Sequence, residues 1–290
     1  MPTVVRLNGQ NLEPASATVA ALDHGFLYGN GLFETLRAID RRPFALSEHL
    51  DRLRRSAEVI GLPLPPSDLL ASEVSQALCA AAEPDAYIRL TVTRGPGASG
   101  PDPASCTEPT VLVVVRALPA PPERWLTEGL RAITSDIRRN STSPLTRVKS
   151  LNYLECILAR QAAKAAGADE ALFLDTEGNL AEATAWNLFF TEGGRLLTPS
   201  DAGPILPGVT RAIVLRLAKE LGIECETGAY HPDRLTAATE AFITNSLYGI
   251  MPLGSLDGRP IGSAVPGPLT SRLAEAYEAL RRCCCCSSDS

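Results

Sequence analysis

Three prolines within four residues, in the segment LPAPPERW, divide the 290-residue chain into two parts. Proline lacks a backbone N–H and fixes its own backbone torsion, so neither a helix nor a central strand runs through Pro119 to Pro122. Because a single hydrophobic core rarely grows beyond ~250–300 residues, a chain of this length has room for two domains. We therefore predict a smaller N-terminal domain at 1–118, a linker at 119–126 and a larger C-terminal domain at 127–282.

Hydrophobic patterning predicts that both domains mix strands with helices. Alternating or β-branched runs such as GLFETLRAI, AYIRLTVTRG and PTVLVVVRAL read as strands of the first domain. Leu50, Leu53 and Ala57 recur at helical spacing ahead of Gly61, which is a typical helix stop. In the second domain, strand patterns such as LRAITSDI, EALFLD and AFITNS alternate with helical ones. The expected fold class is α/β with α+β character.

Net charge excludes one large class of partners. The formal charge is −6 and the isoelectric point is near 5.3, whereas nucleic-acid binding usually needs a concentrated basic face. The sequence has neither an apolar N-terminal leader pattern nor about 18 consecutive apolar residues. We expect a cytoplasmic protein with no nucleic-acid partner and no membrane partner.

The cysteines do not form a metal or disulfide pattern. Cys79, Cys106, Cys156 and Cys225 are isolated from one another, and paired spacing would be needed for a zinc knuckle or a disulfide framework. The run Cys283–Cys286 could bind a soft metal, but a frayed terminus is the more frequent outcome for such a segment. We predict no metal site and a disordered tail at 283–290.

The best chemical clue is Lys149, followed 33 positions later by Glu182. A lysine amine can form a Schiff base with an aldehyde, and a buried carboxylate can hold a heterocyclic nitrogen protonated. Polar residues flank Lys149, and the helix after it is expected to bury Leu154, Ile157 and Leu158. Most lysines are only solvated surface groups, and Glu182, which lies in the apolar segment LAEATAW, could equally form a structural ion pair.

A phosphate site is the second chemical expectation. In ILPGVTRA, Gly208, Val209 and Thr210 fall at the first turn of a predicted helix, where free N–H groups and the helix dipole favour an anion. An ordinary helix start after Pro-Gly, without a bound anion, explains the same sequence equally well. Arg52 and the Thr244–Ser246 strand end could add donors.

The chain as a whole resembles the class IV aminotransferases, which are the fold type IV pyridoxal-phosphate enzymes. The resemblance runs from about Val4 to about Arg281 through a series of motifs in the family's order. They are DHGFLYGNGLFETLR, HLDRL, YIRL, KSLNYLE, DEALFLD, EATAWNLF, LPGVTR, ITNSLYGIMPL and PGPLTSRL. The family includes branched-chain and D-amino-acid aminotransferases and aminodeoxychorismate lyases.

The resemblance implies two domains with pyridoxal 5′-phosphate at their interface, and a homodimer in which the 94–103 loop reaches the partner subunit. It makes Lys149 the catalytic imine lysine and proton shuttle. It assigns cofactor binding to Arg52, Tyr153, Glu182, Gly208, Val209, Thr210, Asn245 and Ser246. On the substrate side it places Phe33, Tyr87, Arg89 and Leu247.

Three functions fit these residues. The first is transamination between a branched-chain or D-amino acid and a 2-oxo acid through a Lys149 Schiff base. The second is 4-amino-4-deoxychorismate lyase activity, which releases pyruvate and 4-aminobenzoate; the turn ITNSLYGIMPL, with Asn245, resembles the lyase version. The third is a noncatalytic binding protein on the same fold, against which the intact Lys149 and Glu182 argue. Family breadth favours the transaminase.

Overall fold

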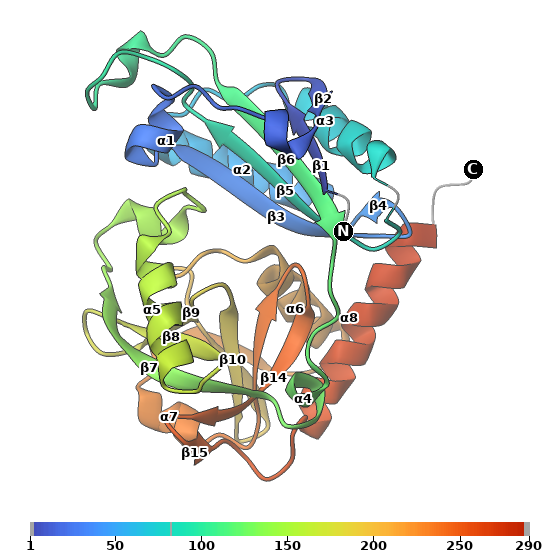
Figure 1. Ribbon diagram of the computed structural model, residues 1–290. Helices are drawn as coiled ribbons and strands as arrows, with labels where there is room; N and C mark the ends of the chain where they lie inside the picture. Colours follow the sequence, from blue (N-terminus) through green and yellow to red (C-terminus); the bar gives the residue numbers. More distant parts are fainter. Residues whose placement is uncertain (1–2, 82, 287–290) are drawn as a thin grey trace. The chain divides into compact units, whose positions relative to one another are not determined.

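The computed structural model describes residues 3–81 and 83–286 and contains two compact units, each with its own sheet (Figure 1). The first unit runs to Pro119 and also includes Val148–Asn152 and the chain from Arg281. The second consists of Ala120–Arg147 and Tyr153–Leu280. This mixture of helices and strands confirms the predicted α/β class. Within the described residues, no helix is long and apolar enough to cross a membrane.

The first unit is an antiparallel sheet with strand order β2-β1-β6-β5-β3-β4. Its strands are β1 (Thr3–Leu7), β2 (Gln10–Leu12), β3 (Gly31–Ile39), β4 (Arg42–Pro43), β5 (Ala86–Thr93) and β6 (Thr110–Ala117). The helices are α1 (His24–Tyr28), α2 (Leu46–Ile60) and α3 (Ser67–Ala80), with 3-10 turns at Pro14–Ser16 and Pro103–Ser105. Alternate strand residues such as Ile88 and Leu90 pack against α2 and α3 to form the core. The residues between them, including Tyr87 and Arg89, therefore lie on the opposite face.

The second unit is a mixed sheet with strand order β12-β11-β10-β13-β14-β7-β8-β9, and β15 pairs with β14. The strands are β7 (Leu130–Arg139), β8 (Glu170–Asp175), β9 (Leu180–Ala183), β10 (Asn187–Glu192), β11 (Arg195–Pro199), β12 (Cys225–Gly228), β13 (Ala241–Asn245), β14 (Gly249–Leu256) and β15 (Arg259–Pro260). The helices are α4 (Glu123–Thr127), α5 (Leu154–Ala165), α6 (Val209–Glu220), α7 (Pro232–Thr236) and α8 (Pro268–Cys286), with a 3-10 turn at Pro144–Arg147. Strand β8 is buried along its whole length, as its unbroken apolar run predicts.

The segment that carries Lys149 differs from the predicted domain division. We assigned it to the C-terminal domain, but residues 148–152 belong to the first unit. The backbone gives the reason: Phe33 N donates to Lys149 O and Leu151 N donates to Gly31 O, each at 3.0 Å. These bonds tie the lysine's own peptide to strand β3.

Three other expectations differ in detail. Helix α4 occupies part of the predicted linker at 119–126. Helix α8 continues to Cys286, where a disordered tail was expected, and residues 287–290 lie outside the described part of the chain. In α5 the small side chains of Cys156, Ala159 and Ala163 are buried instead of the expected larger ones. Leu154, Ile157 and Leu158 are 65%, 49% and 47% exposed.

Candidate active site

In the first unit, Lys149 and Arg89 meet at the ring of Phe33. Lys149 Nζ lies 4.5 Å from the ring centroid, and Arg89 Cζ lies 3.7 Å from it. Arg89 reaches the ring from β5, where Thr91, two residues away, is the direct partner of Phe33 on β3. The π-electrons of the ring attract both side chains, while two positive charges this close repel each other. An anion bound beside them would relieve that repulsion.

Tyr87 lies two residues before Arg89 on the same face of the sheet, and the guanidinium of Arg116 stacks over its ring at 4.1 Å. The structure thus gathers Phe33, Arg89 and Lys149 directly, with Tyr87 next along the strand. These are the residues of the first unit that we predicted for the lysine and the substrate side.

Arg52, the predicted phosphate ligand of the first unit, is buried in an ion-pair network with Glu34 and His49. Its Nε and Nη2 donate to the two Glu34 oxygens at 2.9 and 2.5 Å, and His49 Nδ1 lies 2.6 Å from Glu34 Oε2. Burial opposes the charged carboxylate, but Arg52 and His49 together lower the pKa of Glu34 to about 2. Burial also lowers the pKa of His49. Sequence reasoning missed Glu34, although an acidic residue inside the apolar strand pattern GLFETLR was a signal for it.

This network makes folding sensitive to acid in two steps. A histidine whose pKa is lowered in the fold loses stability as pH falls below its ordinary 6.5. A carboxyl whose pKa is lowered from 4.5 to about 2 contributes stability above pH 4.5, and this is lost as pH falls toward 2. For Glu34 the full loss is about 3 kcal/mol. Urea unfolding between pH 7 and pH 2 measures it. Glu34→Gln is expected to remove the lower step and to enlarge the upper one, because the Glu34 carboxylate acts to raise the pKa of His49.

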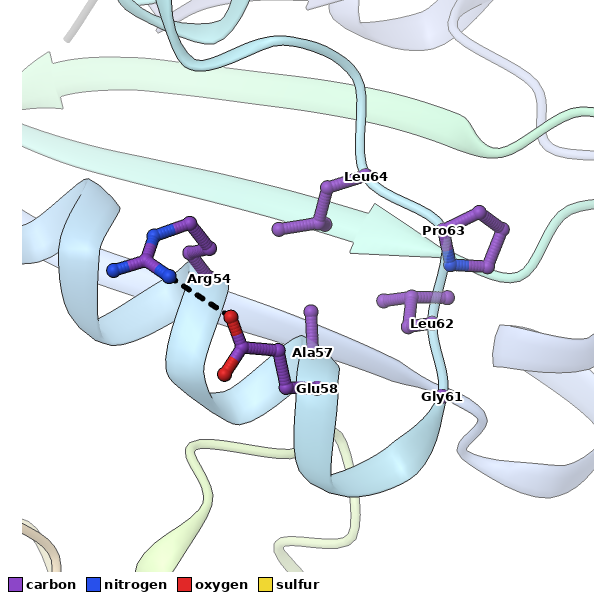
Figure 2. A pocket seen from close by; sticks show the side chains of 7 residues that line it. All are labelled: Arg54, Ala57, Glu58, Gly61, Leu62, Pro63 and Leu64. Atoms are coloured by element: carbon purple, nitrogen blue, oxygen red, sulfur yellow. Dashed lines mark hydrogen bonds and ion pairs between the residues drawn. The ribbon is translucent and has the colours of Figure 1, made fainter.

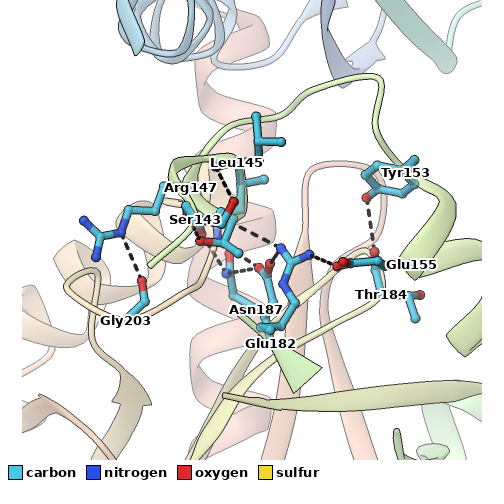
Figure 3. Close-up of polar contacts among 12 residues, drawn as sticks. Ser143, Leu145, Arg147, Tyr153, Glu155, Glu182, Thr184, Asn187 and Gly203 are labelled. Carbon is cyan, nitrogen blue, oxygen red and sulfur yellow. Dashed lines mark hydrogen bonds and ion pairs between the residues drawn. The ribbon is translucent and has the colours of Figure 1, made fainter. Parts of the chain in front are cut away.

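In the second unit, Glu182 is a buried carboxylate with several donors. Its Oε1 accepts from Arg139 Nη2 at 2.7 Å, and its Oε2 accepts from Leu206 N at 3.0 Å and Asn187 Nδ2 at 3.3 Å. Figure 3 shows Glu182 and Asn187 directed toward each other. Burial acts to lower the pKa of Arg139, but Glu182, Cys156 and Glu155 together outweigh it, and the pKa is raised. The ion pair that we considered for Glu182 is therefore present.

Arg139 and Asn187 were missed by sequence reasoning. Arg139 ends strand β7, and its Nε is buried without a hydrogen-bond partner. Asn187 begins β10, and its Nδ2 also donates to Leu206 O at 2.9 Å. The available sequence signal for Asn187 was a side-chain amide at the start of the apolar run NLFF.

Tyr153 lies at the N-cap of α5, four residues after Lys149 in the sequence. Its hydroxyl donates to the backbone oxygen of Thr184 at 3.1 Å (Figure 3). Burial raises the pKa of Tyr153, so the phenol stays protonated at neutral pH. The phenol is thus a fixed, neutral hydrogen-bond donor.

The predicted phosphate turn is the N-terminus of α6, with Gly208 as its N-cap. Gly208 supplies no side chain to the cap, and Val209 and Thr210 begin the helix. The first-turn N–H groups of such a helix favour an anion. A Cβ added at Gly208 would overlap Asn187 Oδ1, so only glycine fits beside that amide.

Gly208→Ala is expected to destabilise the protein by roughly 1–3 kcal/mol, because Asn187 must shift and weaken its contacts with Glu182 and Leu206. Thermal unfolding of the variant measures the loss. Gly203→Ala is the matched control. Its added Cβ would lie 3.1 Å from Ser200 O, a tight contact but far less severe than the overlap at Gly208, so it should cost less stability. Equal losses for the two variants would contradict the packing argument.

Asn245 ends β13, and Ser246 and Leu247 begin the turn that leads to β14. Asn245 Oδ1 accepts from Leu247 N at 3.0 Å and Tyr248 N at 2.9 Å, so Asn245 shapes the turn. Just before it, Thr244 Oγ1 is buried with no hydrogen-bond partner. Thr244 pairs with Asn187 across β10 and β13, which brings this turn close to the Glu182 group.

A hollow of about 350 Å³ lies where α2 ends, lined by Arg54, Glu58 and the 61–64 segment (Figure 2). Arg54 is already paired with Glu58 at 2.8 Å. None of the predicted site residues lines this hollow, so it is not a candidate for the chemistry.

Comparison with known proteins gives one consistent result. The family described as Amino-transferase class IV matches residues 31–256. A putative branched-chain-amino-acid aminotransferase of Methanocaldococcus jannaschii is 41% identical, over 96% of each chain. An aminodeoxychorismate lyase of Bacillus subtilis is 33% identical, over 95% of this chain and 94% of the relative.

Solved structures agree. The branched-chain amino acid aminotransferase of Escherichia coli superposes with a TM-score of 0.91 at 30% identity, covering 96% of this chain and 94% of that one. Another branched-chain amino acid aminotransferase, solved with pyridoxamine 5′-phosphate, matches with a TM-score of 0.90 at 33% identity and the same coverage. Sequence and fold therefore match over nearly the full length of these proteins. The chain belongs to the class IV aminotransferases and is an enzyme that depends on pyridoxal 5′-phosphate.

Proposed function

We propose that the protein is an aminotransferase that moves an amino group between a branched-chain or D-amino acid and a 2-oxo acid, with Lys149 as its catalytic residue. The observation that carries this proposal is the grouping of Lys149 and Arg89 around Phe33. It sets a reactive amine beside a cation suited to a substrate carboxylate. The 41% identity to an aminotransferase supports the same reaction.

The residues of the second unit fit the cofactor. Thr244 Oγ1 is a buried hydroxyl without a partner, and α6 begins at Gly208, which supplies no side chain to bond the N–H groups of the first turn. We assign phosphate binding to Val209, Thr210 and Ser246, with Asn245 shaping the turn. When bound, the cofactor supplies an electron sink for the bond broken at the substrate α-carbon.

The protein's own groups divide the remaining work. The amine of Lys149 attaches the cofactor in the resting enzyme and then carries a proton to and from the substrate α-carbon. Glu182, supported by Arg139, holds a proton on the pyridine nitrogen. Tyr153, whose hydroxyl hydrogen Thr184 O accepts in this structure, would share that hydrogen with the cofactor's 3′-oxygen.

On the substrate side we assign carboxylate recognition to Arg89. Arg89 is only partly buried, and its guanidinium stacks on Phe33. Phe33 and Tyr87 supply apolar surface next to it.

A second candidate is 4-amino-4-deoxychorismate lyase activity. It is favoured by the Asn245 turn, whose side chain bonds two successive backbone N–H groups, and by the Bacillus subtilis relative. Both reactions use the same cofactor residues, so the outcome depends on the substrate side.

A direct assay separates the two. The purified holoenzyme is incubated with pairs of L- or D-amino acids and 2-oxo acids, and in parallel with 4-amino-4-deoxychorismate. Transfer to 2-oxo acids without release of 4-aminobenzoate supports the transaminase. Release of 4-aminobenzoate alone would contradict it.

We also propose a homodimer in which the 94–103 loop reaches the second subunit. The proposal is supported by the exposed apolar side chains Leu154, Ile157 and Leu158, which lie at positions i, i+3 and i+4 of one α5 face. The mass of the holoenzyme, measured by light scattering after size exclusion, tests it. A species of about 31 kDa would contradict the proposal.

A further inference from the structure

Glu170 is a completely buried carboxylate to which the proposed reaction gives no task. It begins strand β8, and its side chain has no exposed surface. Oε2 accepts from Arg160 Nη1 at 2.5 Å, while Oε1 accepts from Ala171 N at 2.9 Å and Thr184 Oγ1 at 2.5 Å. Burial raises the pKa of Glu170, and the charge of Arg160 acts in the opposite direction. A group this costly to bury calls for a structural reason.

Thr184 connects this carboxylate to the proposed cofactor residues. Its hydroxyl and its N–H both point to Glu170 Oε1, at 2.5 and 3.4 Å, and its backbone oxygen accepts from Tyr153 at 3.1 Å. Thr184 also follows Glu182 by two residues. One short segment therefore carries the pyridine carboxylate and the acceptor that fixes the phenol.

We propose that Glu170 is a positioning residue: by holding Thr184, it fixes the backbone oxygen that sets the position of the Tyr153 phenol. The inference rests on the proposed function, in which Tyr153 faces the cofactor. Glu170 itself touches neither cofactor nor substrate in this scheme.

The chemistry explains why the position must be tight. A phenol has one hydrogen to donate, so with the cofactor bound the Thr184 oxygen and the cofactor's 3′-oxygen would share it in a three-centre bond. If Thr184 moves, the phenol moves with it, and its bond to the 3′-oxygen weakens. The charged and titratable groups around Tyr153 are Cys156, Glu182, Arg139 and Glu170. Among them, Glu170 accepts the hydroxyl hydrogen of Thr184.

The test reads the visible absorption band of the bound cofactor as a function of pH. A donor at the 3′-oxygen stabilises negative charge there, so its loss raises the pH midpoint of the spectral change. Tyr153→Phe is expected to raise the midpoint and to weaken cofactor binding about threefold to tenfold, which is the strength of one neutral hydrogen bond. Thr184→Val, which keeps the side-chain shape, is expected to shift both quantities in the same direction. Thr184→Ser, which keeps the hydroxyl, is expected to restore them.

Non-additivity distinguishes positioning from general damage. The double variant Tyr153→Phe/Thr184→Val is expected to match Tyr153→Phe alone, because both changes remove one interaction. Glu170→Gln is expected to follow Thr184→Val. Thr191→Val is the matched control: it removes a buried threonine hydroxyl bonded to Thr239, elsewhere in the same unit, and should leave the band unchanged.

Two failures are distinguishable. If Tyr153→Phe shifts the midpoint but Thr184→Val does not, or if their effects add, the positioning role is overturned while the proposed function stands. If the wild-type protein shows no cofactor band, or if Tyr153→Phe leaves the band unchanged, the proposed role of Tyr153 fails and the positioning role fails with it.

Discussion

Lys149→Ala is expected to lower turnover by at least about a thousandfold and to abolish the visible band of the attached cofactor. The change removes both the attaching amine and the proton carrier, and positioned acid–base groups alone contribute about 10²–10⁴-fold. Stopped-flow turnover with the best substrate pair and an absorption spectrum of the purified protein measure the two effects. Part of the activity should return when methylamine is added, because a small free amine can carry the same proton.

Lys164→Ala is the matched control, since Lys164 is an exposed lysine in the last turn of α5. It should retain wild-type turnover and spectrum. A Lys149→Ala protein that kept its band, or whose turnover fell no further than that of the control, would show that another residue attaches the cofactor.

Glu182→Ala is expected to have the second largest effect, on stability and on activity together. It leaves the Arg139 guanidinium buried without its main counter-charge, and breaking a buried ion pair in this way costs about 3–5 kcal/mol. Denaturant unfolding measures that loss. Turnover should fall roughly 100-fold to 1,000-fold, because no carboxylate then stabilises the proton on the pyridine nitrogen.

Two further variants separate charge from folding. Glu182→Gln keeps an acceptor for Leu206 N but removes the charge, so it should fold more stably than Glu182→Ala and still lose most of the activity. Glu155→Ala removes the other carboxylate near Arg139. The Glu155 side chain is 57% exposed and its Oε2 lies 3.6 Å from Arg139 Nη1, so this variant should change stability and turnover little. Equal effects of Glu155→Ala and Glu182→Ala would contradict the assignment.

The strands and helices could be predicted because local patterns determine them. Alternation in AYIRLTVT and the spacing of Leu50, Leu53 and Ala57 depend on neighbours within a few residues, and the buried cores confirm them. The α5 prediction failed because sequence spacing cannot tell which face of a helix is covered. There, the apolar stripe is exposed and the small residues are buried.

The candidate site residues could be named from motifs, but the residues that hold them in place could not. Glu34, Arg139 and Glu170 come from strands distant in sequence from the residues they hold, and no local pattern announces such pairings. Asn187 lies five residues after Glu182, and its contact depends on the bend between β9 and β10. Each is a polar residue in or beside an apolar strand, a signal that marks a buried partner without identifying it.

The return of residues 148–152 to strand β3 limits how this chain can be divided. Strand β4 covers β3 at Ala38 and Ile39, and the opposite end of the same edge is bonded by the peptides of Lys149 and Leu151. A fragment that stopped at the prolines would expose that edge and would lack the reactive lysine. A fragment beginning after them would have to supply the missing segment in trans. The two halves are therefore interdependent pieces of one polypeptide, and a split-protein complementation assay should regain activity only when the second piece includes residues 148–152.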